Sequence, residues 1–460
     1  MTRKAMRDVV VCLPGITGSV LRKDGRDVWN VSGGALISAL TTLGGSITDL
    51  KLEQDPPDVD DLGDGITAPE VIRDVHLIPG FWKIDGYTKM MRYIEETFDV
   101  THGRNLFEFP YDWRRDNRVA ARRLQRKGRE WLEAWRESSG ADDAKLVLVG
   151  HSMGGLISRY FLECLDGWRE TRALVTFGTP YRGSLNALET LVNGKRIKLF
   201  DLTEVARSFT AIHQLLPTYP CYVEGNAAPA YVDEADVPNL DQGKARAALD
   251  FHREIAAAVE EHRQDPAYAD GGYELARVVG IEQPTKQSAV RDGDRVKLLR
   301  TIGGEDPGGD GTVPRPSATP LEYEDDQGAA FSAERHASLQ TDDHVLLQLT
   351  GVLTGSTINW SQYKDAVPMI DMAMDVEDVY STAEPIVVRA KPKREPRGIL
   401  LTTATDVETG EERTRQTLTR SDDGWYDAEV GPLPEGVYRV TAFGEGAVEP
   451  VTDLVTVLAD

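Results

Sequence analysis

The sequence predicts an α/β protein whose sheet is mostly parallel, followed by a small C-terminal β-sandwich. Short apolar runs typical of buried strands alternate with helical patterns over about the first 360 residues, and this alternation favours a parallel sheet covered on both faces. After about residue 360 the chain changes to short β-rich runs separated by turn-forming stretches such as SDDG and PLPEG. We therefore expect a first domain over residues 1–360, a linker over 361–382 and a β-sandwich over 383–460.

Apolar runs and helical spacing place the elements of the first domain. Val9–Leu13 reads as a strand that ends in PGITG, and NLFEFPYDWR gives a short strand and a turn. Apolar side chains from Val119 to Trp135 fall on one face of a long charged helix. Further strands are expected over residues 145–149, 173–177, 275–281 and 296–302, and further helices over 84–98 and 345–353.

The stretch AKLVLVGHSMGGLISRYFLE runs from a buried strand through a tight turn into a helix. Leu156, Tyr160 and Leu165 recur at helical spacing after the turn. A Gly-x-Ser-x-Gly match alone is weak, but a strand and a helix on either side of it are the setting of a nucleophile elbow. Ser152 would then lie in a strained turn with its hydroxyl exposed, while Gly150 and Gly154 let strand and helix approach each other.

A serine nucleophile needs a base, and the base needs an acid that orients it. In a fold of this kind the acid and the base follow the serine in that order along the chain. Asp310 lies in a Gly-rich loop that follows the predicted strand at 296–302, with Asp306 as an alternative acid nearer the strand end. His336 precedes the last predicted helix and is the expected base, with His344 as the alternative. His151 adjoins the nucleophile and is expected to support the site.

A tetrahedral intermediate at Ser152 would need two hydrogen-bond donors for its oxyanion. One is expected to be the backbone N–H of Met153, the residue after the nucleophile. The second is expected to be the backbone N–H of Ile16 in the PGITG loop, whose glycines allow a close approach of the backbone.

Two segments interrupt the alternation of strands and helices. Residues 31–75 form a Gly-, Asp- and Pro-rich excursion, and residues 190–270 form an insertion with a largely helical pattern. We expect them to lie over the site as lid and cap, because ligand sites need an apolar wall that a bare sheet edge does not give. The candidate wall residues are Leu199, Phe200, Phe209, Leu215, Leu216 and Tyr219.

Composition narrows the classes of partner. The net charge of −23 makes nucleic acid a poor partner. Three cysteines, Cys12, Cys164 and Cys221, are too few for a disulfide framework. The apolar run before Pro14 is too short for a signal peptide, and no run approaches a transmembrane helix in length. We expect a cytoplasmic protein without a membrane anchor, a cofactor or a metal.

The β-rich C-terminal region is expected to be an immunoglobulin-like or prealbumin-like module. Residues 383–460 contain neither histidine nor cysteine, so they supply no nucleophile–base pair. Small sandwiches of this kind are most often binding or docking modules. We therefore expect the domain to be dispensable for chemistry and to recruit a partner protein or orient the enzyme on its substrate.

Several motifs occur together in a characteristic order: LPGITGS, IPGF, FPYDWR, GHSMGG, FGTPYRGS, GDGTVP and the His336 segment. Over residues 8–355 the chain thus resembles the lecithin–cholesterol acyltransferase-like α/β-hydrolases, a family that includes lysosomal phospholipase A2 and phospholipid–diacylglycerol acyltransferases. The resemblance implies a triad of Ser152, Asp310 and His336, an oxyanion hole at Ile16 and Met153, and acyl transfer from a lipid ester to water or an alcohol. It also implies that residues 111–114 are scaffold near the site.

The chain departs from that family in its lid and its C-terminal domain. The better-known members close the lid with a disulfide, whereas residues 31–75 contain no cysteine. The β-sandwich is not part of the family core. A hydrolase of a non-lipid ester or amide, and an inactive scaffold with a partner-binding β domain, therefore stay open as alternatives.

Overall fold

The computed structural model describes residues 3–30, 48–72, 76–77, 83–197, 200–355 and 369–459. At its centre is a six-stranded sheet in the order β18-β15-β11-β10-β2-β9. Every neighbouring pair in this sheet is parallel. The strands are β2 (Val9–Leu13), β9 (Leu106–Glu108), β10 (Leu146–His151), β11 (Thr171–Phe177), β15 (Glu274–Gly280) and β18 (Ala330–Ser332).

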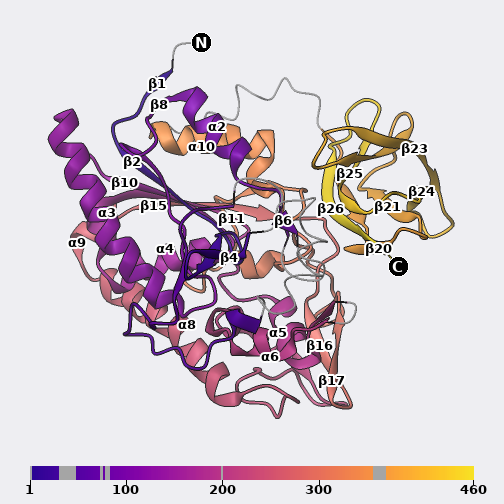
Figure 1. Cartoon of the computed structure of the whole chain (residues 1–460), viewed down its shortest axis with the longest axis horizontal. Coiled ribbons are helices and arrows are strands. Elements are labelled where there is room, and N and C mark those ends of the chain that lie inside the picture. Colours follow the sequence, from indigo (N-terminus) through magenta and orange to yellow (C-terminus); the bar gives the residue numbers. More distant parts are fainter. Residues whose placement is uncertain are drawn as a thin grey trace.

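The inner strands are buried on both faces, which explains their continuous apolar character. Along β2, Val9 and Val11 enter one hydrophobic core, and Val10 and Cys12 enter the other. Figure 1 shows α2 and α10 on one side of the sheet and α3, α4 and α8 on the other. These helices are α2 (Thr88–Thr97), α3 (Asn117–Ser139), α4 (Met153–Cys164), α8 (Gln242–His262) and α10 (Asp343–Thr354).

Shorter elements surround this layered core. The remaining described helices are α5 (Leu185–Asn193), α6 (Thr203–Ser208), α7 (Thr210–His213) and α9 (Pro266–Ala269). Four 3₁₀ turns are described at Thr48–Leu50, Gly167–Glu170, Arg315–Ala318 and Leu339–Thr341. The small sheets contain β1 (Lys4–Ala5), β3 (Leu21–Lys23), β4 (Arg26–Trp29), β5 (Ile66–Thr67), β6 (His76–Leu77), β7 (Lys83–Ile84), β8 (Phe98–Asp99), β12 (Arg196–Ile197), β13 (Phe200–Asp201), β14 (Tyr222–Val223), β16 (Ser288–Asp292) and β17 (Arg295–Leu299).

The strand expected over residues 296–302 exists as β17, but it lies outside the central sheet. It pairs antiparallel with β16, and both belong to a three-stranded sheet with β14. The sixth parallel strand is instead β18, whose three residues give too short a pattern to be recognised from sequence. Periodicity identifies a strand but carries no information about its partner strand. For this reason the placement of residues 296–302 in the parallel sheet was wrong.

The insertion and the excursion are only partly as expected. Residues 214–241, within the segment predicted to be helical, contain turns and the short strand β14 but no described helix. Residues 31–47 and 73–75 of the expected lid lie outside the described residues. The described part, 48–72, is mostly loop and contributes β5 to a three-stranded sheet with β3 and β4.

Eight strands form the C-terminal domain, in the order β19-β21-β24-β23-β22-β25-β26-β20. Strands from the two halves of this order pack around one hydrophobic core. Met372 of β19 and Val388 of β21 cluster there with Val440 of β25 and Val455 of β26. The strands are β19 (Met372–Asp375), β20 (Val379–Ser381), β21 (Ile386–Pro392), β22 (Leu400–Asp406), β23 (Glu412–Arg420), β24 (Tyr426–Val430), β25 (Gly436–Gly444) and β26 (Val451–Leu458). β19 and β20 fall within the expected linker, so residues 370–382 belong to the domain.

Among the described residues, no helix combines the length and apolarity needed to span a bilayer. The three cysteines are free thiols, two of them buried.

Candidate active site

Ser152 lies between β10 and α4 in a strained backbone conformation. Its φ of 52° and ψ of −123° are rare for any residue other than glycine. The strain is held by hydrogen bonds on both sides, because Ser152 N donates to Phe177 O (2.8 Å) and Ser152 O accepts from Gly155 N (3.0 Å) and Thr179 Oγ1 (2.9 Å). The strand–turn–helix pattern therefore folds into the geometry of a nucleophile elbow.

Gly154 lets the first turn of α4 rest directly on the end of β2. A Cβ atom at this position would lie 2.6 Å from the carbonyl oxygens of both Leu13 and Pro14. Contacts that close to backbone oxygens cannot be relieved by a side-chain rotation. The loop after β2 is thereby brought beside Ser152, and a Cβ on Gly15 would lie 3.0 Å from the Cβ of Ser152.

Ser152, His336 and Asp310 form one buried hydrogen-bonded chain. His336 Nε2 lies 3.0 Å from Ser152 Oγ, and His336 Nδ1 lies 2.7 Å from Asp310 Oδ2. The other carboxylate oxygen of Asp310 accepts from the amides of Thr312 (2.9 Å) and Val313 (2.7 Å). Ser152, His336 and Asp310 are 4%, 5% and 1% exposed. This arrangement can pass a proton from the serine to the imidazole and stabilise the resulting cation.

The alternative residues lie elsewhere. Asp306 is exposed and accepts from the amide of Gly308 in its own loop. His344 lies at the start of α10, with a side chain that is 69% exposed and 3.6 Å from Glu449. The structure therefore brings Asp310 and His336, rather than Asp306 and His344, to Ser152. Their catalytic roles stay predictions.

The position of Asp310 depends on strands other than the one that precedes it in the sequence. Asp310 pairs with Gln283 in an isolated bridge just beyond the end of β15. A Cβ on Gly280, the last residue of β15, would lie 2.2 Å from the Cβ of Asp310. Gly178, just after β11, has a φ of +54°, and a Cβ there would lie 2.7 Å from Asp310 Oδ2 and 2.9 Å from His336 Nδ1. Two glycines at the carboxyl ends of neighbouring strands thus make room for the pair.

The two amides expected to hold an oxyanion adjoin Ser152. Met153 is the first residue of α4, so its N–H belongs to the positive end of a twelve-residue helix. Ile16 follows Gly15 in the loop against Ser152 and is 2% exposed. Among the described residues, neither amide donates a hydrogen bond to a protein acceptor. Their role in binding an oxyanion stays a prediction.

His151, which was expected to support the site, forms a buried pair with Tyr87, a residue that the sequence analysis missed. Tyr87 OH accepts from Gly15 N (2.8 Å) and lies 2.8 Å from His151 Nδ1, while His151 Nε2 lies 3.0 Å from the carbonyl oxygen of His336. A carbonyl only accepts, so the proton of neutral His151 is on Nε2 and Tyr87 donates to Nδ1. Burial lowers the pKa of His151 to about 3, helped by nearby His336. Nothing local marks Tyr87, a single tyrosine before a helix.

The residues expected to form an acyl-binding wall are mostly packed into the core. Phe209, Leu215 and Leu216 are 2–4% exposed, and Phe209 packs edge-on against Trp113 with ring centroids 5.6 Å apart. Tyr219 is half-buried and donates to Gln287 O (3.3 Å). Ser184 N donates to Leu215 O (2.8 Å), which ties this segment to the loop after β11. Leu199 and the side chain of Phe200 lie outside the described residues. A role in acyl binding stays a prediction.

Two buried arginines of the FPYDWRR stretch hold the described part of the lid segment. Arg114 pairs with Asp112 (2.6 Å) and Asp64 (2.9 Å). Arg115 pairs with Asp55 (2.9 Å) and also donates to the carbonyl oxygens of Val59 (2.7 Å) and Asp60 (2.8 Å). These bonds attach residues 55–64 to the scaffold without a disulfide.

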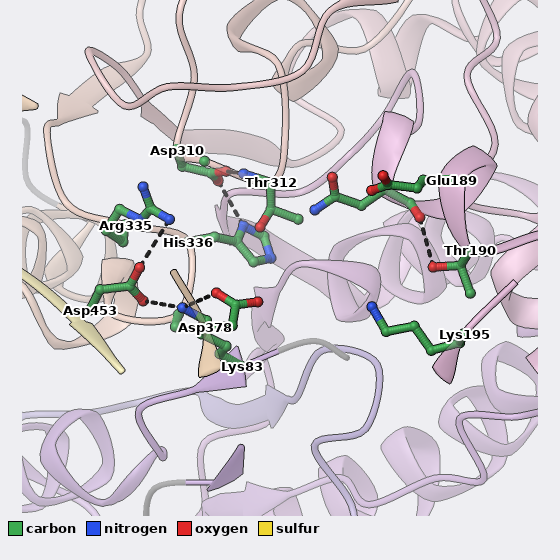
Figure 2. Close-up of a pocket in the computed structure, with 13 residues that line it drawn as sticks. Lys83, Glu189, Thr190, Lys195, Asp310, Thr312, Arg335, His336, Asp378 and Asp453 are labelled. Carbon is green, nitrogen blue, oxygen red and sulfur yellow. Dashed lines mark hydrogen bonds and ion pairs between the residues drawn. The ribbon is translucent and has the colours of Figure 1, made fainter. Parts of the chain in front are cut away.

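A polar cavity of about 220 Å³ opens beside His336 and Asp310. Figure 2 shows that its walls carry charges of both signs, with Lys83, Lys195 and Arg335 facing Glu189, Asp378 and Asp453. Asp378 and Asp453 come from the C-terminal domain. No pattern in the sequence predicts that residues of that domain line a cavity beside His336.

Comparison with known proteins relates part of the chain to acyl-transfer enzymes. The family model "Lecithin:cholesterol acyltransferase" matches residues 50–245. Over 128 residues the chain is 32% identical to lysosomal phospholipase A and acyltransferase of Homo sapiens and 30% identical to that of Rattus norvegicus. Each match covers 25% of this chain and 29% of the relative. The family match includes Ser152 but ends before Asp310 and His336, whose assignment depends on their geometry.

A solved structure has a related fold. A chain of the Tle4-Tli4 complex superposes with a TM-score of 0.50 at 16% sequence identity, covering 77% of this chain and 99% of that chain. At this identity the likeness shows the fold alone.

Gly154→Ala should destabilise the protein by about 1–3 kcal/mol, because the added methyl group collides with two carbonyl oxygens that cannot move aside. Urea unfolding followed by circular dichroism measures the change. Gly243→Ala is the matched control, since Gly243 is exposed near the start of α8 and a Cβ there meets only a carboxylate oxygen of Asp241 at 3.2 Å. Equal unfolding midpoints for the two variants would contradict the role given to Gly154.

Three buried histidines should make the fold sensitive to acid. Burial lowers the pKa of His151 to about 3 and the pKa values of His213 and His252 to about 4, against about 6.5 in the unfolded chain. The unfolded chain therefore binds more protons below pH 6.5, so the free energy of unfolding falls as the pH drops towards 4. Each histidine contributes a slope of up to about 1.4 kcal/mol per pH unit.

His252→Gln tests this pH dependence without touching the site. His252 Nε2 lies 2.8 Å from Gln214 O, and a glutamine can still donate there. The difference in unfolding free energy between pH 7 and pH 5 should shrink in this variant. The matched control is His344→Gln, which removes an exposed histidine and should leave the difference unchanged. If the difference in unfolding free energy between pH 7 and pH 5 were unchanged in both variants, the lowered pKa of His252 would be refuted.

Proposed function

We propose, on the premise that the chain is a lecithin:cholesterol acyltransferase-like α/β-hydrolase, that it is a serine hydrolase or acyltransferase of lipid esters. The observation that carries this proposal is the continuous chain from Ser152 Oγ through His336 to Asp310, with contacts of 3.0 and 2.7 Å. The family match supports the chemical class, and the geometry supports the residues that would perform it.

In the first half-reaction Ser152 Oγ attacks the ester carbonyl carbon while its proton passes to His336 Nε2. Asp310 accepts the Nδ1 proton of His336 in a hydrogen bond and stabilises the imidazolium. The carbonyl oxygen becomes an oxyanion, and the amides of Met153 and Ile16 are the donors proposed to bind it. When the intermediate collapses, the C–O bond to the alcohol breaks, and His336 returns its proton to the leaving oxygen.

In the second half-reaction the acyl group on Ser152 is transferred to water or to an alcohol. His336 takes a proton from the incoming hydroxyl, which attacks the acyl carbonyl, and then returns the proton to Ser152. Water gives a fatty acid, and an alcohol gives a new ester. The reaction needs no redox partner, because bonds are exchanged without a change in oxidation state.

His151 supports this chemistry without taking part in proton transfer. As a neutral side chain it places no positive charge beside His336, so it does not oppose formation of the imidazolium there. Its bonds to Tyr87 OH and His336 O connect the loop after β2 with the loop that carries the base. These bonds would fix the Ile16 amide and the His336 imidazole in position relative to Ser152.

Product analysis by mass spectrometry tests the substrate class. Mixed phospholipid vesicles are incubated with the protein in the presence of glycerol or a sterol as acyl acceptor. Release of fatty acid or formation of acylated acceptor supports the proposal. Turnover of short nitrophenyl esters without action on any phospholipid would favour a non-lipid ester or amide as the substrate. No turnover and no labelling by a fluorophosphonate would indicate an inactive scaffold.

Ser152→Ala should abolish turnover and leave the fold intact. Only the hydroxyl can form the acyl-enzyme, whereas the turn is held by backbone bonds and by neighbouring glycines. We expect a loss of roughly 10⁴-fold or more in kcat on a nitrophenyl ester, with an unchanged circular dichroism spectrum. Activity within about tenfold of the parent protein would rule out Ser152 as the nucleophile.

His336→Ala should be about as damaging as Ser152→Ala, because a nucleophile and its base act as one unit and their losses are not additive. His344→Ala is the matched control and should retain most of the activity, since its side chain is exposed on α10. Steady-state kinetics and the rate of fluorophosphonate labelling measure both variants. Inactivity of His344→Ala with activity of His336→Ala would reverse the assignment of the base.

A further inference from the structure

The C-terminal domain packs against the edge of the central sheet where the site lies. Figure 1 shows β26, in yellow, on the side of that domain that faces residues 1–360, which we call the hydrolase domain, and β26 contacts the short strand β6. Bonds between the domains surround the site: Gln283 donates to Met372 O and accepts from Met374 N, both at 3.0 Å, and Thr452 N donates to Glu334 (3.1 Å).

Asp453 of β26 lies at the centre of this contact. Its side chain is 1% exposed and pairs with Lys83 (3.0 Å) and Arg335 (2.9 Å), both from the hydrolase domain. Figure 2 shows the carboxylate between these two cations. A buried carboxylate is stable only when it is compensated by such partners. Lys83 also pairs with Asp378 (2.6 Å), whereas Asp453 is the carboxylate that Arg335 pairs with among the described residues.

Arg335 directly precedes His336, so its side chain and that of the base leave the same short segment of backbone. Besides its pair with Asp453, Arg335 donates to Met374 O of β19 (2.9 Å). It also packs over Gly311, where an added Cβ would lie 3.0 Å from the guanidinium carbon. Arg335 is therefore clamped between the turn that carries Asp310 and two strands of the C-terminal domain.

This clamp constrains the distance on which proton transfer depends. His336 Nε2 lies 3.0 Å from Ser152 Oγ, and a displacement of about 1 Å at a reacting group can lower a rate by about 100-fold. Loss of the charge on Asp453 would remove the ion-pair partner of Arg335, whereas Lys83 would keep its pair with Asp378. Arg335 would then lose the ion pair that holds its side chain to β26, and the segment that carries His336 would lose this restraint.

We infer that the C-terminal β domain completes the active site, and that Asp453 is a positioning residue that acts through Arg335 on His336. The inference rests on the proposed function, because it assigns His336 as the base. It replaces the expectation of a separable docking module: the domain contributes no reacting group, but it holds the segment that does. It also encloses the cavity beside His336, with Asp378 and Asp453 on one wall.

The test uses the full chain with Asp453→Asn, which keeps the size of the side chain and removes its charge. The rate of fluorophosphonate labelling of Ser152 and kcat on a short nitrophenyl ester, both per folded molecule, should fall together by about 10- to 100-fold. The value of KM should change little, because the cavity wall keeps its shape. Asp427→Asn is the matched control, since the described partners of Asp427, Arg389 and Ser421, belong to the same domain.

Arg335→Lys tests the Arg335–Asp453 ion pair by changing its partner in the hydrolase domain. It also provides a test if Asp453→Asn does not fold. Lysine keeps the charge but cannot contact Asp453 and Met374 O with one planar fork, so labelling should again fall by about tenfold. The double variant should be no slower than Asp453→Asn alone, because the two residues act in series.

The possible results separate this inference from the proposed function. A parent chain that neither hydrolyses the ester nor reacts with the fluorophosphonate would overturn the proposed function and this inference with it. An active parent chain whose two variants are labelled at the parental rate per folded molecule would overturn the inference alone, even if both variants melt at a lower temperature. That second result would mean that Asp453 only stabilises the fold.

Discussion

Ser152 keeps its strained backbone because Gly154 lets α4 lie directly on the carbonyl oxygens of Leu13 and Pro14. This close approach does more than shape one turn. It brings the loop after β2 against Ser152 and sets the N-terminus of α4 towards the same point. The parallel sheet supplies the frame, because all of its strands end at one edge and their following loops meet there.

The site is then held together by buried polar groups that connect loops from distant parts of the sequence. Tyr87 and His151 join the loop after β2 to the backbone of His336, and two amides fix the carboxylate of Asp310. Each of these groups is costly to bury unless it is hydrogen-bonded. Because these groups satisfy one another's hydrogen bonds, they restrict the site to one arrangement, and the neutral state of His151 places no positive charge beside His336.

Ion pairs join the two domains beside the site. The chain as a whole carries a net charge of −23, yet the cavity beside His336 gathers three cations from the hydrolase domain. Two of these cations pair with the C-terminal domain: Lys83 with Asp378 and Asp453, and Arg335 with Asp453. The C-terminal domain, which has no histidine or cysteine after residue 383, thus supplies two carboxylates to the wall of this cavity.

The sequence by itself determined the features that are encoded within one short segment. The elbow at residues 144–163 could be predicted because its strand, turn and helix are contiguous, and the order of acid and base along the chain pointed to Asp310 and His336. The two layers of helices and the β-rich C-terminal region followed from periodicity and turn residues. The elbow, the helices and the β-rich region depend on neighbours within a few residues, and local patterns describe such neighbours well. The order of acid and base joins residues far apart along the chain, and the catalytic roles of Asp310 and His336 stay predictions.

Only the tertiary structure decided which segments meet. It placed β17 in a small separate sheet, set Asp310 beside the end of β15, packed Phe209 and Leu216 into the core, and brought Tyr87 and Asp453 to the site. The physical reason is that strand partners and buried ion pairs join residues dozens to hundreds of positions apart. Their energy depends on burial and on exact distance, neither of which is visible in the spacing of residue types along a chain.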